Sequence, residues 1–417
     1  MTFLFTMLSM ANHVFSDPKQ RIELIKEKCA SLSRAIEDNK EALTQELLKC
    51  ESFETATDEI WRSLDCLENI SKEFEDLSYG KVSLLCTFFP VNLPLYSLVI
   101  FAIVPGFMAE EVVVRPPKLM FEVVENIWKV LGLSKLLPHI KFVDLERSLF
   151  REAYVSIADV VLFTGRYENA KVIQEACPDA LFIYNGAGIN PVLITESANI
   201  DLAVEKTTEM RIFNSGQDCA GSDAVLVHEK IANEFCKKLV TKIKDIKVGD
   251  YADREVRVGR LVKVDQIDTI EKFFAENSKK IIFGGKIDKD AGIVYPTVIK
   301  DDIRNISEIT YTEFFAPVFY LLVYHDEDDL QRYFADGYTD GAMYISLFSA
   351  DKNAASIPNS IVLLDQIVND VERGNNPYGG YGPKANFVSY HGIYHYRPIL
   401  ISKEICEYLH EINSAQD

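Results

Sequence analysis

The residues best suited to chemistry lie in the stretch Phe213 to Gly221, which reads Phe-Asn-Ser-Gly-Gln-Asp-Cys-Ala-Gly and contains Cys219. A thiolate is a strong nucleophile, and the glycines at 216 and 221 let the backbone approach a substrate closely. The alternative is a buried structural cysteine in a glycine-containing turn, which is the commoner role of a free cysteine. Taken alone, the stretch leaves both interpretations open.

The composition is that of a globular chain with two or three domains. The 417 residues are 48% hydrophobic and 26% charged, which allows substantial cores. A formal net charge of −19 opposes binding to nucleic acid or to an anionic membrane, because phosphate is repelled. The apolar run Val91 to Phe107 contains prolines at 94 and 105, and it predicts a strand, a turn and a buried helix instead of a membrane span.

The eight cysteines include no CxxC pair and do not cluster with histidine at metal-ligand spacing. We therefore expect reduced thiols, no bound metal and a cytoplasmic location. The apolar run Met1 to Met10 lacks the basic start and the long hydrophobic region of a signal peptide.

The elements that must position Cys219 alternate between helices and strands. Residues 18–78 predict amphipathic helices, because apolar residues from Ile22 to Ile36 recur at helical spacing. From Val82 onward buried strands alternate with helices, and this order predicts a parallel sheet. A strand ending at Thr164-Gly165 and followed by a helix is a place where backbone N–H groups meet a phosphate, or a turn that needs glycine for its geometry.

The pattern also predicts the domain organisation. A second α/β layer begins near residue 187, so we expect N-terminal helices and a first α/β domain over residues 1–185. A second α/β domain carrying Cys219 is expected over residues 186–390. The tail, residues 391–417, contains an alternating run like an edge strand, and we expect it to return to the first domain or to contact another subunit.

Five stretches, in this order, resemble the aldehyde dehydrogenase superfamily. They are Phe163-Thr-Gly165, Gly188-Ile-Asn-Pro-Val192, Asn214 to Cys219, Glu313-Phe-Phe-Ala-Pro-Val318 and Pro377-Tyr-Gly-Gly-Tyr381. Each is weak alone, but the shared order makes the resemblance specific. It implies an α/β fold in which residues 1–185 form the N-terminal helices and a Rossmann-type parallel-sheet domain that binds a nicotinamide cofactor. Residues 186–390 would form a second α/β domain, the catalytic domain carrying Cys219.

The resemblance also implies roles for individual residues. Cys219 corresponds to the nucleophile, and the side-chain amide of Asn92 corresponds to the donor that holds the negative oxygen of the covalent intermediate. Gly165 belongs to the phosphate-side turn. Glu313 corresponds to the ligand of the nicotinamide ribose, and Phe315 would pack near the ring.

One departure concerns the general base. Ordinary members of the family carry a glutamate that activates water for thioester hydrolysis, and the matching residue here is Asn185, 34 residues before Cys219. An amide cannot accept that proton. The branches that exchange acyl groups with coenzyme A also carry a non-acidic residue there, so the resemblance implies an acyl-thioester reductase or acylating aldehyde dehydrogenase. The thiol partner would be coenzyme A or a carrier-protein arm.

A second departure concerns the cofactor. The family's usual Lys-Pro-Ser-Glu type segment is replaced by Arg115-Pro-Pro-Lys118, and Arg166 follows the phosphate-side turn. Cations in place of a carboxylate favour a 2′-phosphate, and we expect NADP(H) over NAD(H). The alternative is that these side chains are solvated surface cations.

The N-terminal part is shorter than the family's, which puts the usual tetramer in doubt and favours a dimer among homo-oligomers. Two other functions remain open. One is a catalytically inactive scaffold or regulatory protein with the same fold. The other is a hydrolytic aldehyde dehydrogenase whose base comes from elsewhere, for instance Glu196 or Glu209.

Overall fold

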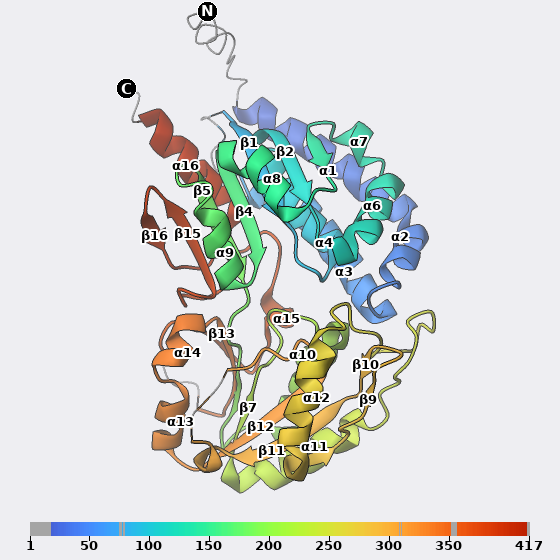
Figure 1. Ribbon diagram of the computed structural model, residues 1–417, viewed down its shortest axis with the longest axis vertical. Helices are drawn as coiled ribbons and strands as arrows, with labels where there is room; N and C mark the ends of the chain where they lie inside the picture. The colour runs from blue at the N-terminus through green and yellow to red at the C-terminus, as the bar shows by residue number, and fades with distance from the viewer. Residues whose placement is uncertain are drawn as a thin grey trace, which may run out of the picture.

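The computed structural model describes residues 18–74, 77, 80–307, 309, 311–351 and 357–414, and the run Met1 to Met10 lies outside them. Figure 1 shows two α/β domains arranged along the longest axis, each built on its own sheet. The predicted fold class is confirmed.

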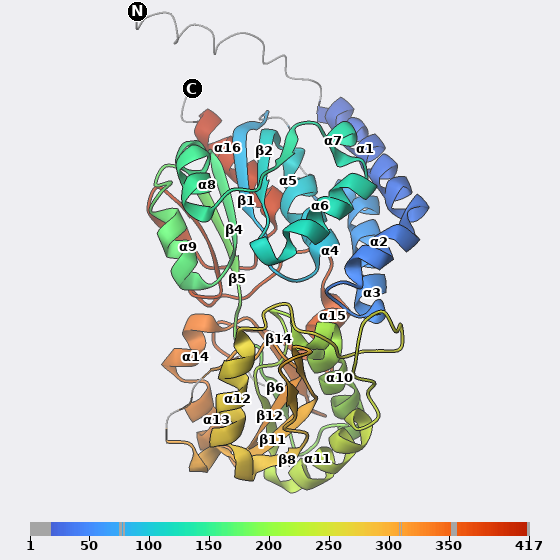
Figure 2. The same ribbon diagram turned by 45° about the vertical axis from the view of Figure 1, so that its right-hand side comes forward.

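Three helices precede the first strand, namely α1 (Pro18–Asp38), α2 (Lys40–Leu47) and α3 (Phe53–Glu68). In α1 the buried stripe recurs every three or four residues from Ile25 to Ile36, as the spacing predicts. The Ser52 side chain begins α3 by accepting the Thr55 N–H at 3.2 Å. Figure 2 shows the three helices along one side of the upper domain.

The upper domain holds a seven-stranded sheet in the order β16-β15-β5-β4-β1-β2-β3. Its strands are β1 (Val82–Phe88), β2 (Ala109–Arg115), β3 (Ile140–Phe142), β4 (Val160–Gly165), β5 (Leu181–Gly186), β15 (Asn386–Tyr390) and β16 (Ile393–His395). The first five are parallel, and β15 and β16 continue the sheet antiparallel at one edge. A parallel sheet is buried on both faces, which accounts for the runs of apolar residues in these strands.

Helices cover both faces of this sheet. One face packs against α8 (Arg147–Ala153) and α9 (Tyr167–Gln174), through buried residues such as Phe150 and Ile173. The other face packs against the N-terminal helices, α6 (Phe121–Val130) and α16 (Ile401–Ser414).

The chain returns to the upper domain through β15, which pairs with β5 so that Asn386 lies opposite Asn185. This return begins at Asn386, five residues before the position expected for the tail. Within the alternating run of the tail, Ile393–His395 forms the edge strand β16, and α16 adds Ile405 and Leu409 to the core.

The lower domain holds a second seven-stranded sheet in the order β14-β13-β6-β7-β12-β11-β8. Its strands are β6 (Val192–Ile194), β7 (Val225–His228), β8 (Ile281–Phe283), β11 (Thr297–Asp302), β12 (Val318–Tyr324), β13 (Tyr344–Phe348) and β14 (Ile361–Leu364). All neighbours are parallel except β8, which is antiparallel to β11. A two-stranded ribbon of β9 (Ile287–Asp288) and β10 (Ile293–Val294) lies beside it.

Alternating residues of the lower strands face different helices. Val225 and Val227 pack with α10 (Ile200–Ile212) and α11 (Glu229–Ile243), whereas Leu226 packs with α13 (Glu327–Tyr333) and α14 (Asp336–Gly341). Helix α12 (Gln266–Glu276) packs on a separate cluster that includes Val318.

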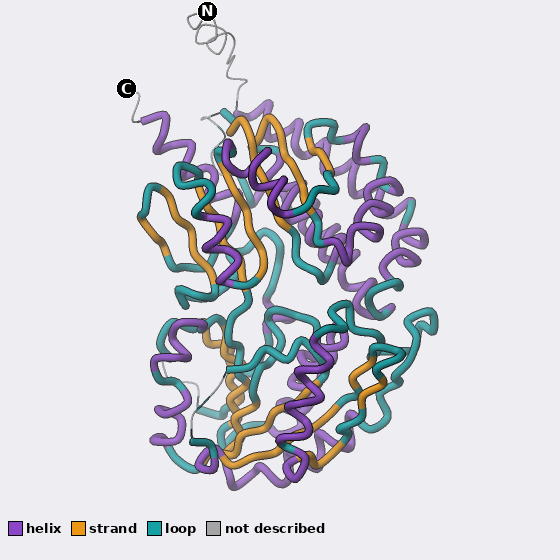
Figure 3. The backbone as a smooth tube through the Cα atoms, in the orientation of Figure 1, coloured by secondary structure: helices purple, strands orange, loops and turns teal. Residues whose placement is uncertain are grey.

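The apolar run Val91 to Phe107 forms a broken helix between β1 and β2. It consists of α4 (Pro94–Leu98), a π-helical segment (Val99–Ile103) and α5 (Val104–Gly106). No helix in the described ranges is long and apolar enough to cross a membrane. Figure 3 shows that loops gather where the two domains meet, which is where the site lies.

Candidate active site

Cys219 follows α10 in a loop whose backbone bends sharply. Asn214, Ser215 and Gly216 have φ angles of 47°, 55° and 77°, in the left-handed region. A Cβ on Gly216 would lie 2.4 Å from the carbonyl of Ala316, so a larger residue would displace the loop from the segment before β12.

Buried hydrogen bonds hold this loop in place. The guanidinium of Arg211 donates to the carbonyl oxygens of Ser222 at 2.5 Å and Gly216 at 2.6 Å. The side-chain amide of Asn190 donates to the Cys219 carbonyl oxygen at 2.9 Å. Because Arg211 is buried and charged, these contacts are costly to break and keep the loop rigid.

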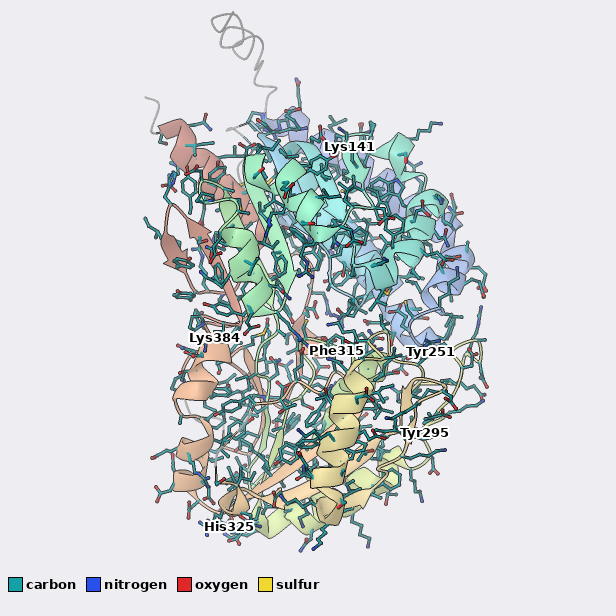
Figure 4. All side chains as sticks on the ribbon, in the orientation of Figure 1. Lys141, Tyr251, Tyr295, Phe315, His325 and Lys384 are labelled. Atoms are coloured by element: carbon teal, nitrogen blue, oxygen red, sulfur yellow. The ribbon has the colours of Figure 1, made fainter. Side chains whose placement is uncertain are left out.

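A cavity of about 400 Å³ between the domains brings the predicted residues together. Its wall includes Cys219 from the lower domain and Asn92 and Asn185 from the upper domain. The other predicted residues on the wall are Gly165, Arg166, Glu313 and Phe315. Figure 4 shows Phe315 where the two domains meet.

The Cys219 thiol is partly buried, and its Sγ lies 3.2 Å from the hydroxyl oxygen of Tyr378. Burial raises the pKa of this thiol well above its ordinary value, and the charge of Asp218 raises it further. The resting thiol is therefore protonated at neutral pH, and its activation depends on the groups around it.

Asn92 and Asn185 reach the cavity from the ends of β1 and β5, the two strands that flank β4 in the upper sheet. Asn92 lies in the turn between β1 and α4, and its carbonyl oxygen accepts the Ser97 hydroxyl at 3.1 Å. Leu93, the next residue, has a φ of 49°, which turns the chain into α4. Asn185 lies on β5, and its Oδ1 is buried without a protein hydrogen-bond partner. This unpaired acceptor lies beside the cavity and is free to bind a ligand donor.

Glu313 and Phe315 lie in the segment before β12, and beside them lies Lys263, a residue of the loop before α12 that the motifs did not identify. Lys263 places its Nζ 5.4 Å from the centre of the Phe315 ring. The surrounding protein raises the pKa of the Glu313 carboxyl, and the positive charges of Lys263 and Arg211 oppose this shift. Burial lowers the pKa of Lys263.

The cations on the cavity wall are only partly those predicted from the sequence. Arg166 precedes α9 and lines the wall, and Arg147, at the start of α8, lines it as well. Arg147 donates to the side chain of Asn169 at 3.2 Å. Arg115 instead donates to the Leu145 carbonyl oxygen at 2.8 Å.

Lys118 is also outside the cavity wall. Its side chain is 89% exposed and lies 3.9 Å from Glu146. The structure thus assembles seven of the nine predicted site residues around one cavity, and Arg115 and Lys118 are not on its wall.

The suggested alternative bases lie elsewhere. Glu196 forms a surface ion pair with Lys230, and Glu209 lies 3.1 Å from Lys206. Neither carboxylate lines the cavity. Carboxylates on the described wall include Asp218 and Glu372.

Glu372 is held by a buried arginine that sequence motifs do not reveal. The Arg62 side chain is 4% exposed and forms 2.6 Å ion pairs with Asp58 in its own helix and with Glu372, 310 residues away. Its guanidinium also lies over the rings of Tyr96 and Phe213. Arg62 therefore ties α3 to the loop that lines the cavity.

A pair of buried carboxyls supports α4, the helix after Asn92. Glu59 accepts the N–H of Tyr96 at 2.7 Å, and the buried Glu51 carboxyl interacts with it electrostatically. Burial raises the pKa of Glu59 to about 7, and burial with the adjacent Glu59 raises the pKa of Glu51 further. The native pair keeps protons that an unfolded chain, with a glutamate pKa of about 4.3, has lost.

We expect the free energy of unfolding to fall as pH rises from about 4.3 through about 7, because the native state binds more protons over this range. Glu51→Gln should make this decline shallower, since one buried titrating group is removed. Urea denaturation of the variant and of the wild type at several pH values measures the effect. The exposed Glu68→Gln serves as the control, and equal slopes for all three proteins would contradict the assignment.

The donor set fits a nicotinamide dinucleotide. Such a ligand presents ribose hydroxyls, which a carboxylate such as Glu313 accepts, and phosphates, which Arg166 and the N-terminus of α9 favour. Gly165 has a φ of 143°, which glycine adopts readily and other residues do not. This turn therefore has no side chain between its backbone and a ligand. In the described part of the chain no group of three His, Cys, Asp or Glu side chains forms a metal site.

Comparisons with known proteins agree with this arrangement. The model of the Aldehyde dehydrogenase family matches residues 150–384. A lactaldehyde dehydrogenase of Methanococcus aeolicus is 29% identical over 264 residues, which are 60% of this chain and 55% of that protein. A lactaldehyde dehydrogenase of Methanocaldococcus jannaschii is 26% identical over 310 residues, or 70% and 64% of the two chains. The matches thus span between half and two thirds of these relatives.

Solved structures show the same fold at lower identity. The glyceraldehyde-3-phosphate dehydrogenase GapN of Methanocaldococcus jannaschii, complexed with NADP, superposes with a TM-score of 0.73 and 20% identity over 88% of this chain and 87% of that one. An apo betaine aldehyde dehydrogenase of Staphylococcus aureus gives a TM-score of 0.73 and 18% identity over 89% and 84% of the two chains. With the family model matching more than half of its length, the chain belongs to the aldehyde dehydrogenase family.

Proposed function

We propose that this chain is an NAD(P)-dependent oxidoreductase that carries an acyl group on Cys219 and exchanges it with another thiol instead of hydrolysing it. The observation that supports this most is the position of Asn185, whose amide lies on the cavity wall with Cys219. Hydrolysis of a thioester needs a base that activates water, and an amide cannot supply one.

The proposed reducing reaction starts from an acyl thioester and needs no water. Cys219 gives up its proton and its thiolate attacks the carbonyl carbon. The second thiol leaves as a thiolate that takes up a proton, which leaves the acyl group on Cys219. A reduced nicotinamide, when bound, supplies the hydride that converts the carbonyl into an alkoxide. Collapse of this alkoxide breaks the carbon–sulfur bond, releases an aldehyde and restores the Cys219 thiolate.

The negative oxygen formed in both steps needs donors. We assign the side-chain amide of Asn92 and the backbone N–H of Cys219 to this role, since Asn92 lines the same cavity and donates without carrying a charge. Glu313 and Phe315, which line the same cavity, would hold the nicotinamide ribose and ring.

A direct test follows absorbance of the reduced nicotinamide while the full chain is incubated with NADPH and a panel of acyl-coenzyme A thioesters. We expect oxidation of NADPH with at least one thioester. A protein that binds no nicotinamide in calorimetry and turns over no thioester or aldehyde would instead be the inactive scaffold. Aldehyde oxidation in the absence of any added thiol would identify a hydrolytic enzyme.

Asn185→Glu tests the missing base. We expect this variant to gain thiol-independent aldehyde oxidation by about 10²-fold, the usual contribution of a positioned general base. Asn185→Gln is the matched control, because glutamine has the size of glutamate but cannot accept the proton. If both variants remain as slow as the wild type in this assay, Asn185 is not what prevents hydrolysis.

We also propose a preference for NADP(H), now supported by Arg147 and Arg166 on the cavity wall. Arg147→Ala should lower the ratio of NADPH affinity to NADH affinity by about 10-fold, because one charge-assisted contact to the 2′-phosphate is lost. Calorimetric titration with both cofactors measures this ratio. The exposed Lys118→Ala is the control, and an equal change in both variants would remove Arg147 from the phosphate site.

A further inference from the structure

Tyr378 contacts the reacting sulfur and is itself rigidly held. Its hydroxyl oxygen lies 3.2 Å from the Cys219 Sγ, and both residues line the cavity. The Tyr378 backbone exchanges hydrogen bonds of 2.9 and 2.8 Å with Ile399 in both directions. Its ring packs on Tyr344 at 5.7 Å between centres, and the Tyr344 hydroxyl accepts the N–H of Gly379 at 2.9 Å. The phenol therefore reaches the sulfur from a fixed position.

The charges that face this thiol are negative and come from three segments. Asp218 belongs to the thiol's own loop, Glu372 follows α15 (Val368–Val371), and Glu313 precedes β12. All three oppose formation of the Cys219 thiolate. The hydrogen bond from Tyr378 acts in the opposite direction and favours the thiolate.

Several cations around the cavity have partners of their own. Arg62 pairs with Glu372, and the guanidinium of Arg373 lies 4.8 Å from the centre of the Trp61 ring. Lys263 lies over the ring of Phe315, and Arg166 lines the wall where phosphate is favoured. The neighbouring phenol touches the sulfur and is a neutral donor that can stabilise the thiolate.

The phenol stays protonated at this position. Burial raises the pKa of Tyr378 well above its ordinary value, and the nearby Cys219 and Glu372 raise it further. In a contact between a thiolate and a neutral phenol, the hydroxyl is the donor.

We propose that the Tyr378 hydroxyl is a catalytic hydrogen-bond donor to the Cys219 sulfur, which stabilises the thiolate before attack and again when the carbon–sulfur bond breaks. This role extends the proposed function of Cys219, but the reactivity of the thiol can be measured without substrate or cofactor. Failure of the turnover assay and failure of this proposal are therefore separate results.

The experiment measures alkylation of Cys219 in the full chain by iodoacetamide, with the modified peptide quantified by mass spectrometry over a range of pH. Tyr378→Phe should lower the alkylation rate at Cys219 by about 10-fold at each pH below the midpoint, because one hydrogen bond to a charged sulfur is lost. Tyr324→Phe is the control. It removes a buried hydroxyl that donates to the Ile194 carbonyl oxygen at 3.3 Å and lies outside the cavity wall, so its profile should match that of the wild type.

A second substitution keeps the shape of the side chain and strengthens the donor. Replacement of Tyr378 by a fluorinated tyrosine makes the phenol more acidic, and it should raise the alkylation rate at a given pH. This variant decides the question if Tyr378→Phe fails to fold. Unchanged rates in a folded Tyr378→Phe protein, or a slower reaction in the fluorinated protein, would overturn the proposal.

Discussion

Cys219→Ala should abolish nicotinamide-dependent turnover of both aldehydes and acyl thioesters, with a loss of about 10⁴-fold or more. The reason is that a carbonyl substrate then has no nucleophile to form the covalent intermediate, and removal of such a nucleophile leaves only the contribution of the binding site. The initial rate of the absorbance change, measured with excess variant protein, gives the loss.

Two controls separate loss of chemistry from loss of structure. Cys236→Ala removes a buried thiol from the distant helix α11 and should retain turnover. Cys219→Ala itself should bind nicotinamide with nearly the affinity of the wild type, since the cofactor contacts come from other residues. Turnover within 10-fold of the wild type in Cys219→Ala would show that the reaction does not pass through this thiol.

Arg62→Met should lower the free energy of unfolding by about 3–5 kcal/mol. The substitution leaves the carboxylates of Asp58 and Glu372 without their buried partner, and an unpaired buried charge is costly. Urea denaturation followed by circular dichroism measures the difference. Because Glu372 lines the cavity, the variant should also bind nicotinamide or substrate less well at temperatures where it is still folded.

The double variant Arg62→Met with Glu372→Gln distinguishes an orphaned charge from simple loss of packing. It should recover part of the lost stability, because the neutral amide no longer needs a counter-ion. A double variant less stable than Arg62→Met, or a single variant within about 1 kcal/mol of the wild type, would contradict this account of the buried pair.

The order of motifs in the sequence was enough to predict the family and much of the candidate site. Asn92 and Asn185 lie on one cavity because the turn after β1 and the end of β5 are at the same edge of a parallel sheet, and Cys219 faces them from the lower domain. The stripe of α1 was predictable for a local reason, since burial repeats at the helical period. Strand β5 was not predicted, because five of its six residues are buried and they show no alternation that separates them from the preceding helix.

Other parts of the site depend on contacts that no local pattern contains. Tyr378 reaches Cys219 across 159 residues, and Arg62 reaches Glu372 across 310 residues. The predicted cations show the same limit, because Arg115 and Lys118 have the expected charge but their side chains point to Leu145 and Glu146. A motif identifies residue types, whereas the direction of a long side chain is decided by its neighbours in space.

The pairing of β15 with β5 has a consequence for synthesis of the protein. The upper sheet is begun by β1 but is completed only by β15 and β16, after the whole lower domain has been translated. Until then the edge of β5, which carries Asn185, is an unpaired row of N–H and C=O groups open to other chains. We therefore expect a nascent chain paused in the lower domain to depend on chaperones more than a finished chain does. Aggregation should stop competing with folding once residues 386–414 have left the ribosome.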